Sequence, residues 1–302
     1  MTAPTLPATP AGELVGWFEP GSDQWHAARA QGIGGSEISA VLGISPFESY
    51  FSLWHRKQGL IAPVEESDQM RWGKRLEAPI VDEFADLHPE TVVMPSPTYH
   101  DTGRPWQIVN PDRLLINGDG QMELLEVKTS RDAEGWGEED TDQIPVYYKA
   151  QVRWYMDALG IHRCRVIVLI SGSDYREYVV EHDEADAAVM RERAEEFMRT
   201  LRDNERPSID GHDATYQAIK QLPDGLDDVD IQICPDLRAQ YFQALANYET
   251  AKDAKQQAAG LVLDRIGTGR RAVVGLNKVA TRTVRNGKTY SLQPARNREI
   301  PA

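Results

Sequence analysis

The spacing of apolar and polar residues divides the chain into segments with a helical period and segments with a strand period. Apolar residues recur every three to four positions in the segments 36–42, 49–58, 70–84, 146–160 and 184–203. Short apolar runs bounded by turn residues occur at 106–109, 113–116, 121–128, 165–170 and 176–181. Strands and helices that follow one another in this way predict an α/β fold with a central mixed sheet flanked by helices.

A β-hairpin is predicted around Asn117-Gly-Asp-Gly120, a strong turn signal between two apolar runs. Asp112 then lies at the edge of one strand, opposite the end of the returning strand that carries Glu126-Val127-Lys128. Side chains alternate along a strand, so Glu126 and Lys128 share one face and Val127 points to the other, toward the core. The hairpin therefore brings two carboxylates and an ammonium together.

Two carboxylates beside a lysine are the minimum equipment for cutting a phosphodiester with Mg²⁺. Such oxygen ligands suit Mg²⁺, with Mn²⁺ as a substitute, and the carbonyl of Val127 would add a backbone ligand. Lys128 would hold the attacking water and screen charge on the phosphate. The alternative is a turn cap at Asp112 and a solvated Glu126 and Lys128 pair, because short motifs often arise by chance.

Two predicted helices add polar residues near this site. In 70–84, Glu77 lies one step from the apolar stripe and is a candidate inner or water-mediated metal ligand. In 146–160, Gln151 and Tyr155 are four residues apart and therefore share a helix face.

The segment Gly34-Gly35-Ser36-Glu37 precedes an apolar helical period and predicts a helix N-terminus, where free backbone N–H groups favour an anion. Ser36 is either a plain N-cap or an anion contact, and the two roles are compatible. From the sequence alone, Arg29 is equally well a surface arginine.

Taken in order, these motifs resemble those of the RecB-type PD-(D/E)xK nucleases: Gly73 with Glu77, Asp112, Glu126-x-Lys128, and Gln151-x-x-x-Tyr155. The segment 25–43 is similar to the start of the YqaJ-like viral recombinases, the lambda-exonuclease type. The resemblance covers about residues 20–205.

This resemblance implies a restriction-endonuclease-like core and an exonuclease that degrades one strand of duplex DNA from the 5′ end. The 3′ overhangs would serve annealing recombination. Arg29 and Ser36 would hold the 5′-terminal phosphate, and Gln151 would lie between that phosphate and the metal. The implied partners are double-stranded DNA ends, a single-strand annealing protein and further copies of the chain in a ring.

The implied catalytic residues are Glu77, Asp112, Glu126, Lys128, Gln151 and Tyr155. The implied metal ligands are Glu77, Asp112, Glu126 and the carbonyl of Val127. Two other functions are consistent with the same pattern, because a fold and a metal site do not fix a substrate. One is a structure-specific or restriction-type endonuclease. The other is a non-catalytic DNA-binding recombination scaffold, against which the presence of Lys128 and Gln151 weighs.

Composition limits the class of protein. No apolar run reaches the ~18 residues of a membrane span, and the start lacks the pattern of a signal peptide. We therefore expect a soluble protein in the cytoplasm, that of the bacterial host if the gene is phage-encoded. The two cysteines, Cys164 and Cys234, predict reduced thiols rather than a disulfide framework.

The formal net charge of −14 is unusual for a DNA-binding protein, but its distribution is uneven. Residues 265–302 carry a net +8, which leaves −22 on residues 1–264. The predicted organisation is a disordered tail at 1–19, a nuclease domain at 20–205, a linker at 206–234 and a basic helix and hairpin at 235–302. The basic extension is either a solvated or oligomerisation arm or a contact for DNA or a partner.

Overall fold

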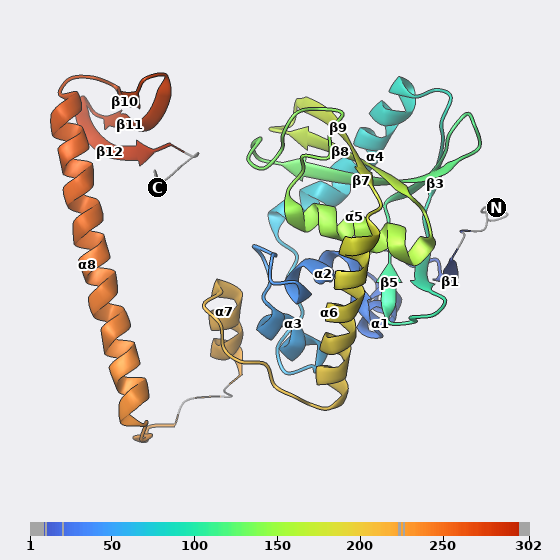
Figure 1. Cartoon of the computed structure of the whole chain (residues 1–302), viewed down its shortest axis with the longest axis horizontal. Helices are drawn as coiled ribbons and strands as arrows, with labels where there is room; N and C mark the ends of the chain where they lie inside the picture. The colour runs from blue at the N-terminus through green and yellow to red at the C-terminus, as the bar shows by residue number, and fades with distance from the viewer. Residues whose placement is uncertain (1–8, 10, 20, 223–224, 226, 296–302) are drawn as a thin grey trace. The chain divides into compact units, whose positions relative to one another are not determined.

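The computed structural model describes residues 9, 11–19, 21–222, 225 and 227–295, and it forms two compact units, 1–226 and 227–302 (Figure 1). The helices of the first unit are α1 (Asp23–Ala30), α2 (Gly35–Val41), α3 (Tyr50–Lys57), α4 (Asp68–Leu87), α5 (Val146–Leu159), α6 (Glu184–Arg202) and α7 (Asp213–Gln221). Its strands are β1 (Gly12–Gly16), β2 (Ile33–Gly34), β3 (Val92–Pro95), β4 (Thr98–Asp101), β5 (Gln107–Val109), β6 (Arg113–Ile116), β7 (Met122–Ser130), β8 (Arg163–Ile170) and β9 (Asp174–Glu181).

The central sheet of the first unit has the strand order β3-β6-β7-β8-β9. Strands β7 and β8 are parallel and the other neighbours are antiparallel, so the sheet is mixed. The parallel pair is joined through α5, as a parallel connection requires. Strands β6 and β7 form the predicted hairpin, in which Arg113 is paired with Leu125. The predicted α/β architecture is confirmed.

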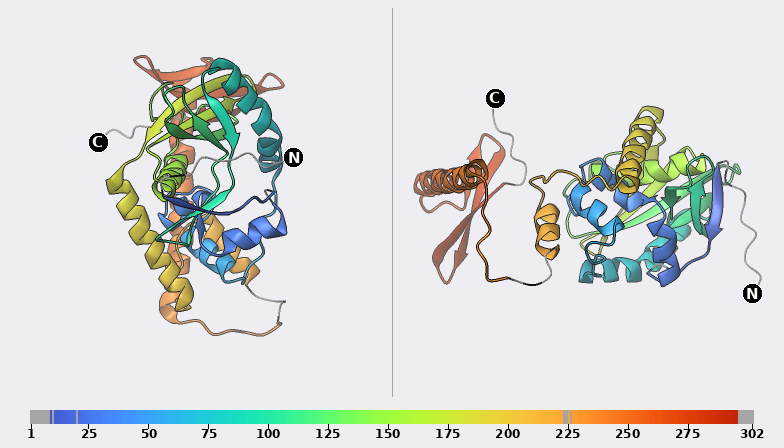
Figure 2. Two further views of the ribbon diagram at one scale, coloured as in Figure 1. Left: turned by 90° about the vertical axis from the view of Figure 1, so that its right-hand side faces the viewer. Right: turned by 90° about the horizontal axis from the view of Figure 1, so that it is seen from below.

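Helices cover both faces of this sheet (Figure 2). On one face, Ile80, Val81 and Phe84 of α4 pack with Leu125 and Ile167 of the sheet. On the other face, α5 covers the alternate residues of the same strands in the larger core cluster, and α6 packs on α5 and α2. The alternation along β7 therefore decides which residues lie under α4 and which lie under α5.

The segment expected to be a disordered tail contains a strand. Strand β1 pairs antiparallel with β4 in a smaller sheet of order β1-β4-β5-β2. The main chain there is held closely, because Ala11 N donates to Leu159 O and a Cβ at Gly12 would lie 2.4 Å from Leu159 Cδ2. Residues 1–8 and 10 of the expected tail lie outside the described residues.

The segment 206–234, expected to be a linker, contains α7. Thr215 of this helix is buried and donates a hydrogen bond to Ser49 Oγ over 2.6 Å. Ala218 packs with Phe51 and Ile61 in a third apolar cluster. The fully buried residues of α7 are small, and Ile219 packs on the same cluster while partly exposed.

The second unit consists of α8 (Pro235–Ile266) and a three-stranded sheet of β10 (Arg271–Val274), β11 (Asn277–Arg285) and β12 (Lys288–Pro294). Asn286 and Gly287 take φ of 52° and 73° in the turn between β11 and β12, as predicted for a tight hairpin. No residue of α8 is buried. Within the described parts of the chain, none of the helices is long and apolar enough to cross a membrane.

Candidate active site

The three polar groups predicted from the hairpin lie together. Asp112 immediately precedes β6 and is opposite Glu126, since the next residues along the hairpin, Arg113 and Leu125, are paired. Asp112 Oδ2 accepts a hydrogen bond from the backbone N–H of Val127 over 2.7 Å. Lys128 Nζ lies 2.5 Å from Glu126 Oε1. The side chain of Val127 points away and packs on the α4 face.

Glu126 is the most constrained member of this cluster, with an exposed fraction of only 2%. Its Oε1 accepts hydrogen bonds from Lys128 and from Gln151 Nε2, the latter over 2.6 Å. Its Oε2 is buried and has no hydrogen-bond partner in the described part of the chain. Burying a carboxylate oxygen without a hydrogen-bond partner costs folding free energy, and coordination of a hard metal ion by this oxygen would offset that cost.

The electrostatics of the cluster also fit a cation. Burial raises the pKa of Asp112 well above its usual value, and the negative charge of Glu126 raises it further. Burial likewise raises the pKa of Glu126. Burial would lower the pKa of Lys128, but the carboxylates of Glu126 and Asp112 raise it above its ordinary range. Two carboxylates and one ammonium leave a net negative charge in the cluster when both acids are ionised, and this charge favours a cation.

Glu77 lies on α4 at the edge of this cluster. Its Oε1 is 2.7 Å from Nη1 of Arg113, which also donates to the carbonyl of Asp112 over 2.6 Å. The charge of Glu77 contributes to the raised pKa of both Asp112 and Glu126. Glu77 therefore lies near Asp112 and Glu126. Its carboxylate forms an ion pair with Arg113, which no pattern in the sequence predicts. A role for Glu77, or for the Val127 carbonyl, as a metal ligand stays a prediction.

Gln151 and Tyr155 share one face of α5, and both are buried. Gln151 Nε2 is 2.9 Å from Tyr155 Oη as well as in contact with Glu126. Burial raises the pKa of Tyr155, so its hydroxyl stays protonated. A Cβ at Gly35 would lie 2.2 Å from Tyr155 Cε1, so only glycine allows α2 to approach α5 this closely.

Arg29 and Ser36 also lie together, since Arg29 Nη2 donates to Ser36 Oγ over 2.8 Å. The Arg29 guanidinium lies 4.5 Å from the centre of the Trp25 ring. Helix α2 begins at Gly35 with Gly34 as its N-cap, so Ser36 is not the N-cap. Gly34 can occupy this position because its lack of a side chain leaves room for Arg29, which a Cβ would approach to 2.6 Å.

An unpredicted carboxylate and lysine complete this region. Glu37 Oε2 accepts from the backbone N–H of Gly34 over 2.7 Å and therefore occupies part of the expected anion site. Lys57 Nζ lies 2.9 Å from the same oxygen. Burial opposes ionisation of Glu37, but Lys57 and Arg29 together hold its pKa below the usual value. Lys57 lies 20 residues from Glu37, so no local pattern in the sequence connects the two.

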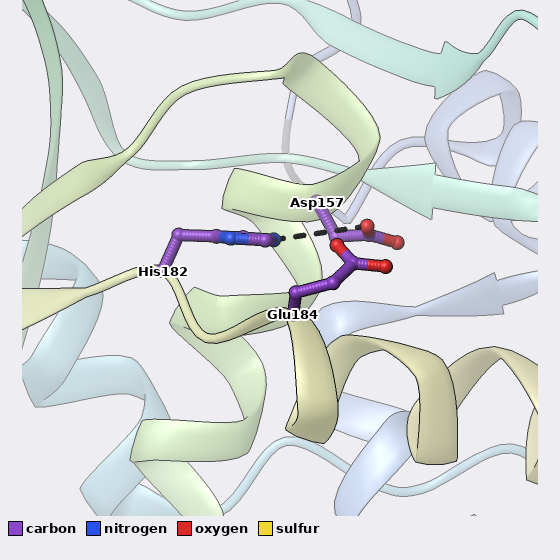
Figure 3. Close-up of side chains that lie close together, drawn as sticks. All are labelled: Asp157, His182 and Glu184. Atoms are coloured by element: carbon purple, nitrogen blue, oxygen red, sulfur yellow. Dashed lines mark ion pairs between the residues drawn. The ribbon is translucent and has the colours of Figure 1, made fainter.

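A second group of metal-type side chains lies away from this cluster. Asp157, His182 and Glu184 converge where β9 leads into α6, with His182 Nε2 at 3.9 Å from Asp157 Oδ1 (Figure 3). Arg191 pairs with both Asp157 and Glu184. Gln107 also donates to Asp157, over 2.9 Å. The Arg191 guanidinium thus takes the place that a metal ion would occupy, and these residues form a structural ion-pair network.

Comparison with known proteins identifies the central part of the chain. Residues 24–162 match the family model of the YqaJ-like viral recombinase domain. The matched segment, 24–162, is similar to this family and is referred to as the YqaJ-like domain. The YqaJ-like domain contains all of the predicted site residues, from Arg29 to Tyr155. Strand β9 and helix α6 lie beyond the matched segment.

A relative of the YqaJ-like domain is the uncharacterized protein YqaJ of Bacillus subtilis, 28% identical over 209 residues. The alignment covers 66% of this chain and 62% of that protein, so the match spans less than two thirds of the relative.

Two solved structures are similar in chain trace. One is the alkaline exonuclease LHK-Exo from Laribacter hongkongensis, with a TM-score of 0.47 and 17% identity over 66% of this chain and 97% of that one. The other is a phage related exonuclease from Haemophilus somnus, with a TM-score of 0.42 and 8% identity over 64% of this chain and 96% of that one.

Proposed function

We propose that the YqaJ-like domain is a metal-dependent deoxyribonuclease that degrades duplex DNA from an end. The observation that carries this proposal is the unsatisfied Oε2 of Glu126, in a buried cluster with Asp112 and Lys128. Viral recombinases process DNA, so the family supports a DNA substrate for this cluster. The metal would be Mg²⁺, with Mn²⁺ as a substitute, because the ligands are hard oxygens.

Asp112 and Glu126 would hold the metal, which when bound supplies Lewis-acid polarisation of the phosphate and a more acidic water. The protein fixes the ligands beforehand: the Val127 N–H holds Asp112 and the Gln151 amide holds Glu126. The carboxylates of Glu126 and Asp112 raise the pKa of Lys128, so in the metal-free protein it is a charged hydrogen-bond donor beside the proposed metal ligands.

We further propose that Arg29 and Ser36 bind the 5′-terminal phosphate, which would give digestion from the 5′ end and 3′ overhangs. Their direct hydrogen bond supports a joint role, and a terminal phosphate would compete with Glu37 for Arg29. A single-strand annealing partner and a ring of several copies belong to the same proposal. They rest on the resemblance alone.

The test compares two isosteric substitutions on the same strand. Glu126→Gln should lower digestion of linear duplex DNA by at least about 100-fold, because it removes a metal-ligand charge. Glu123→Gln is the matched control, since Glu123 is equally buried at 2% but pairs with Arg165 away from the cluster. Digestion by Glu126→Gln at the wild-type rate would refute the proposal. Covalently closed circles should survive, and their rapid nicking would instead indicate an endonuclease.

A further inference from the structure

A path of aromatic rings leads from Lys128 to the protein surface. Lys128 Nζ lies 4.7 Å from the centre of the Tyr148 ring. The Tyr148 and Tyr147 rings, in the first turn of α5, have centres 4.4 Å apart. The Tyr147 ring meets Phe47 edge-on, with centres 5.5 Å apart. Phe47, in the loop between α2 and α3, is 70% exposed.

Phe47 contacts the Tyr147 ring but belongs to none of the apolar core clusters of the described residues. The neighbouring aromatic residues Phe51 and Trp54 are 0% and 2% exposed and belong to the core. Phe47 follows Pro46 in a segment tied down by Ser45, whose Oγ accepts from the backbone N–H of Phe47 over 3.1 Å. An exposed aromatic ring on a fixed loop is typical of a binding surface.

The same residue lines a groove of about 500 Å³. The groove lies between α3, the segment 61–65 and α7, and its polar lining includes Ser52, Arg56 and Gln217. Two carboxylates, Glu65 and Asp213, also line it, and its one arginine, Arg56, pairs with Glu48, so the lining has a net negative charge. Affinity in this groove would therefore come from stacking and hydrogen bonds more than from charge.

We propose that Phe47 and Tyr147 stack on unpaired bases of the DNA strand next to the scissile phosphate, and that the groove receives the nucleotides that follow. The proposal rests on the nuclease function proposed for Lys128 and its neighbours. A ring of this kind can stack only on a base whose face is free, because the bases inside a duplex already stack on one another. Every base has such a face, so the contact would tolerate any sequence.

The test measures binding in EDTA, where no metal-dependent cleavage can occur. A labelled oligothymidylate and a blunt DNA duplex are titrated with the full chain and followed by fluorescence anisotropy. Phe47→Ala should bind the oligothymidylate about 5-fold to 100-fold more weakly, as expected for the loss of one stacked base, and the blunt duplex within about 2-fold of wild type. Phe47→Trp should restore the affinity. The loss should be similar at low and moderate salt, because stacking releases no counterions.

The matched control is Tyr216→Ala on α7. Tyr216 is 63% exposed, close to the exposure of Phe47, but does not line the groove. Equal binding of oligothymidylate by Phe47→Ala and wild type, or an equal loss in Tyr216→Ala, would overturn the proposal. Cleavage is assayed separately with Mg²⁺. If the wild type does not cleave DNA, the proposed nuclease function is refuted. If Phe47→Ala still weakens single-strand binding in that case, the proposed stacking contact is supported independently.

Discussion

Lys128→Met should destabilise the metal-free protein as well as inactivate it. Methionine approximates the length of lysine but removes the ammonium that lies 2.5 Å from Glu126 Oε1. The side chains of Lys128 and Glu126 are only 15% and 3% exposed, so this is not a surface pair of negligible value. Removing one partner of a buried ion pair costs about 3–5 kcal/mol, because the other charge is left without compensation.

The size of this effect should depend on pH. The pKa of Asp112 is raised in the folded protein, so the folded state binds this proton more tightly than the unfolded state does. The stability from that proton is present below the unfolded pKa and is lost as pH rises through the folded pKa. The same sign holds for Glu126, whose pKa is also raised. Without Lys128, both carboxylates can protonate to limit the penalty, so the destabilisation should grow from pH 5 to pH 8.

A second substitution in the same cluster, Asp112→Asn, should change the free energy of unfolding in the opposite direction. Asp112→Asn keeps an oxygen that can accept from the Val127 N–H, and it removes one of two like charges. In EDTA at pH 8 we expect it to stabilise the protein by about 1 kcal/mol, although it removes a proposed metal ligand.

The assay is thermal unfolding in EDTA at several pH values. For a unit of this size, 1 kcal/mol shifts Tm by about 2–4 °C, so Lys128→Met should lower Tm by about 6–20 °C at pH 8. A Lys128→Met protein as stable as wild type at pH 8, or an Asp112→Asn protein that loses as much stability, would show that the cluster is open to solvent.

Three further predictions concern ligands. Mg²⁺ at about 100 times its dissociation constant should stabilise the wild type by about 2.7 kcal/mol in thermal unfolding, and Asp112→Asn should lose most of this gain. A duplex with a 5′-phosphate should be digested faster than one with a 5′-hydroxyl in a gel time course, and Arg29→Ala should remove the difference; a wild type indifferent to the 5′ group would contradict the phosphate site. Truncation after residue 226 should weaken DNA binding and flatten its salt dependence by about 0.9 per lost phosphate contact, because residues 267–294 contain six Lys and Arg and no acidic residue; an unchanged slope would favour an oligomer or partner role.

Local spacing predicted the centre of the site well. The period of two along β7 places Glu126 and Lys128 on one face, and the helical period of α5 places Gln151 and Tyr155 on one face. These relations are fixed by backbone geometry within a single element, so the sequence contains them directly. The hairpin turn then sets the register that brings Asp112 opposite Glu126.

Contacts between distant elements could not be predicted in the same way. The pairing of Glu77 with Arg113 spans 36 residues, and the hydrogen bond from Thr215 to Ser49 spans 166. Neither pair has a pattern in the sequence, because each depends on how two elements pack. For the same reason the sequence predicts a linker where α7 lies: its two fully buried residues, a threonine and an alanine, contact elements far away in the sequence.

The close approach at Gly35 fixes the distance between two parts of the site. Helix α2 carries Ser36, and α5 carries Gln151 and Tyr155, and the two helices meet through the space that a side chain at position 35 would fill. If Ser36 binds the strand end and Glu126 holds the metal, the distance between them decides how many nucleotides lie between the bound end and the cleaved bond. Main-chain packing at Gly35 would set this distance, and not mobile side chains. Gly35→Ala would force the two helices apart and would therefore change the spacing between Ser36 and Gln151.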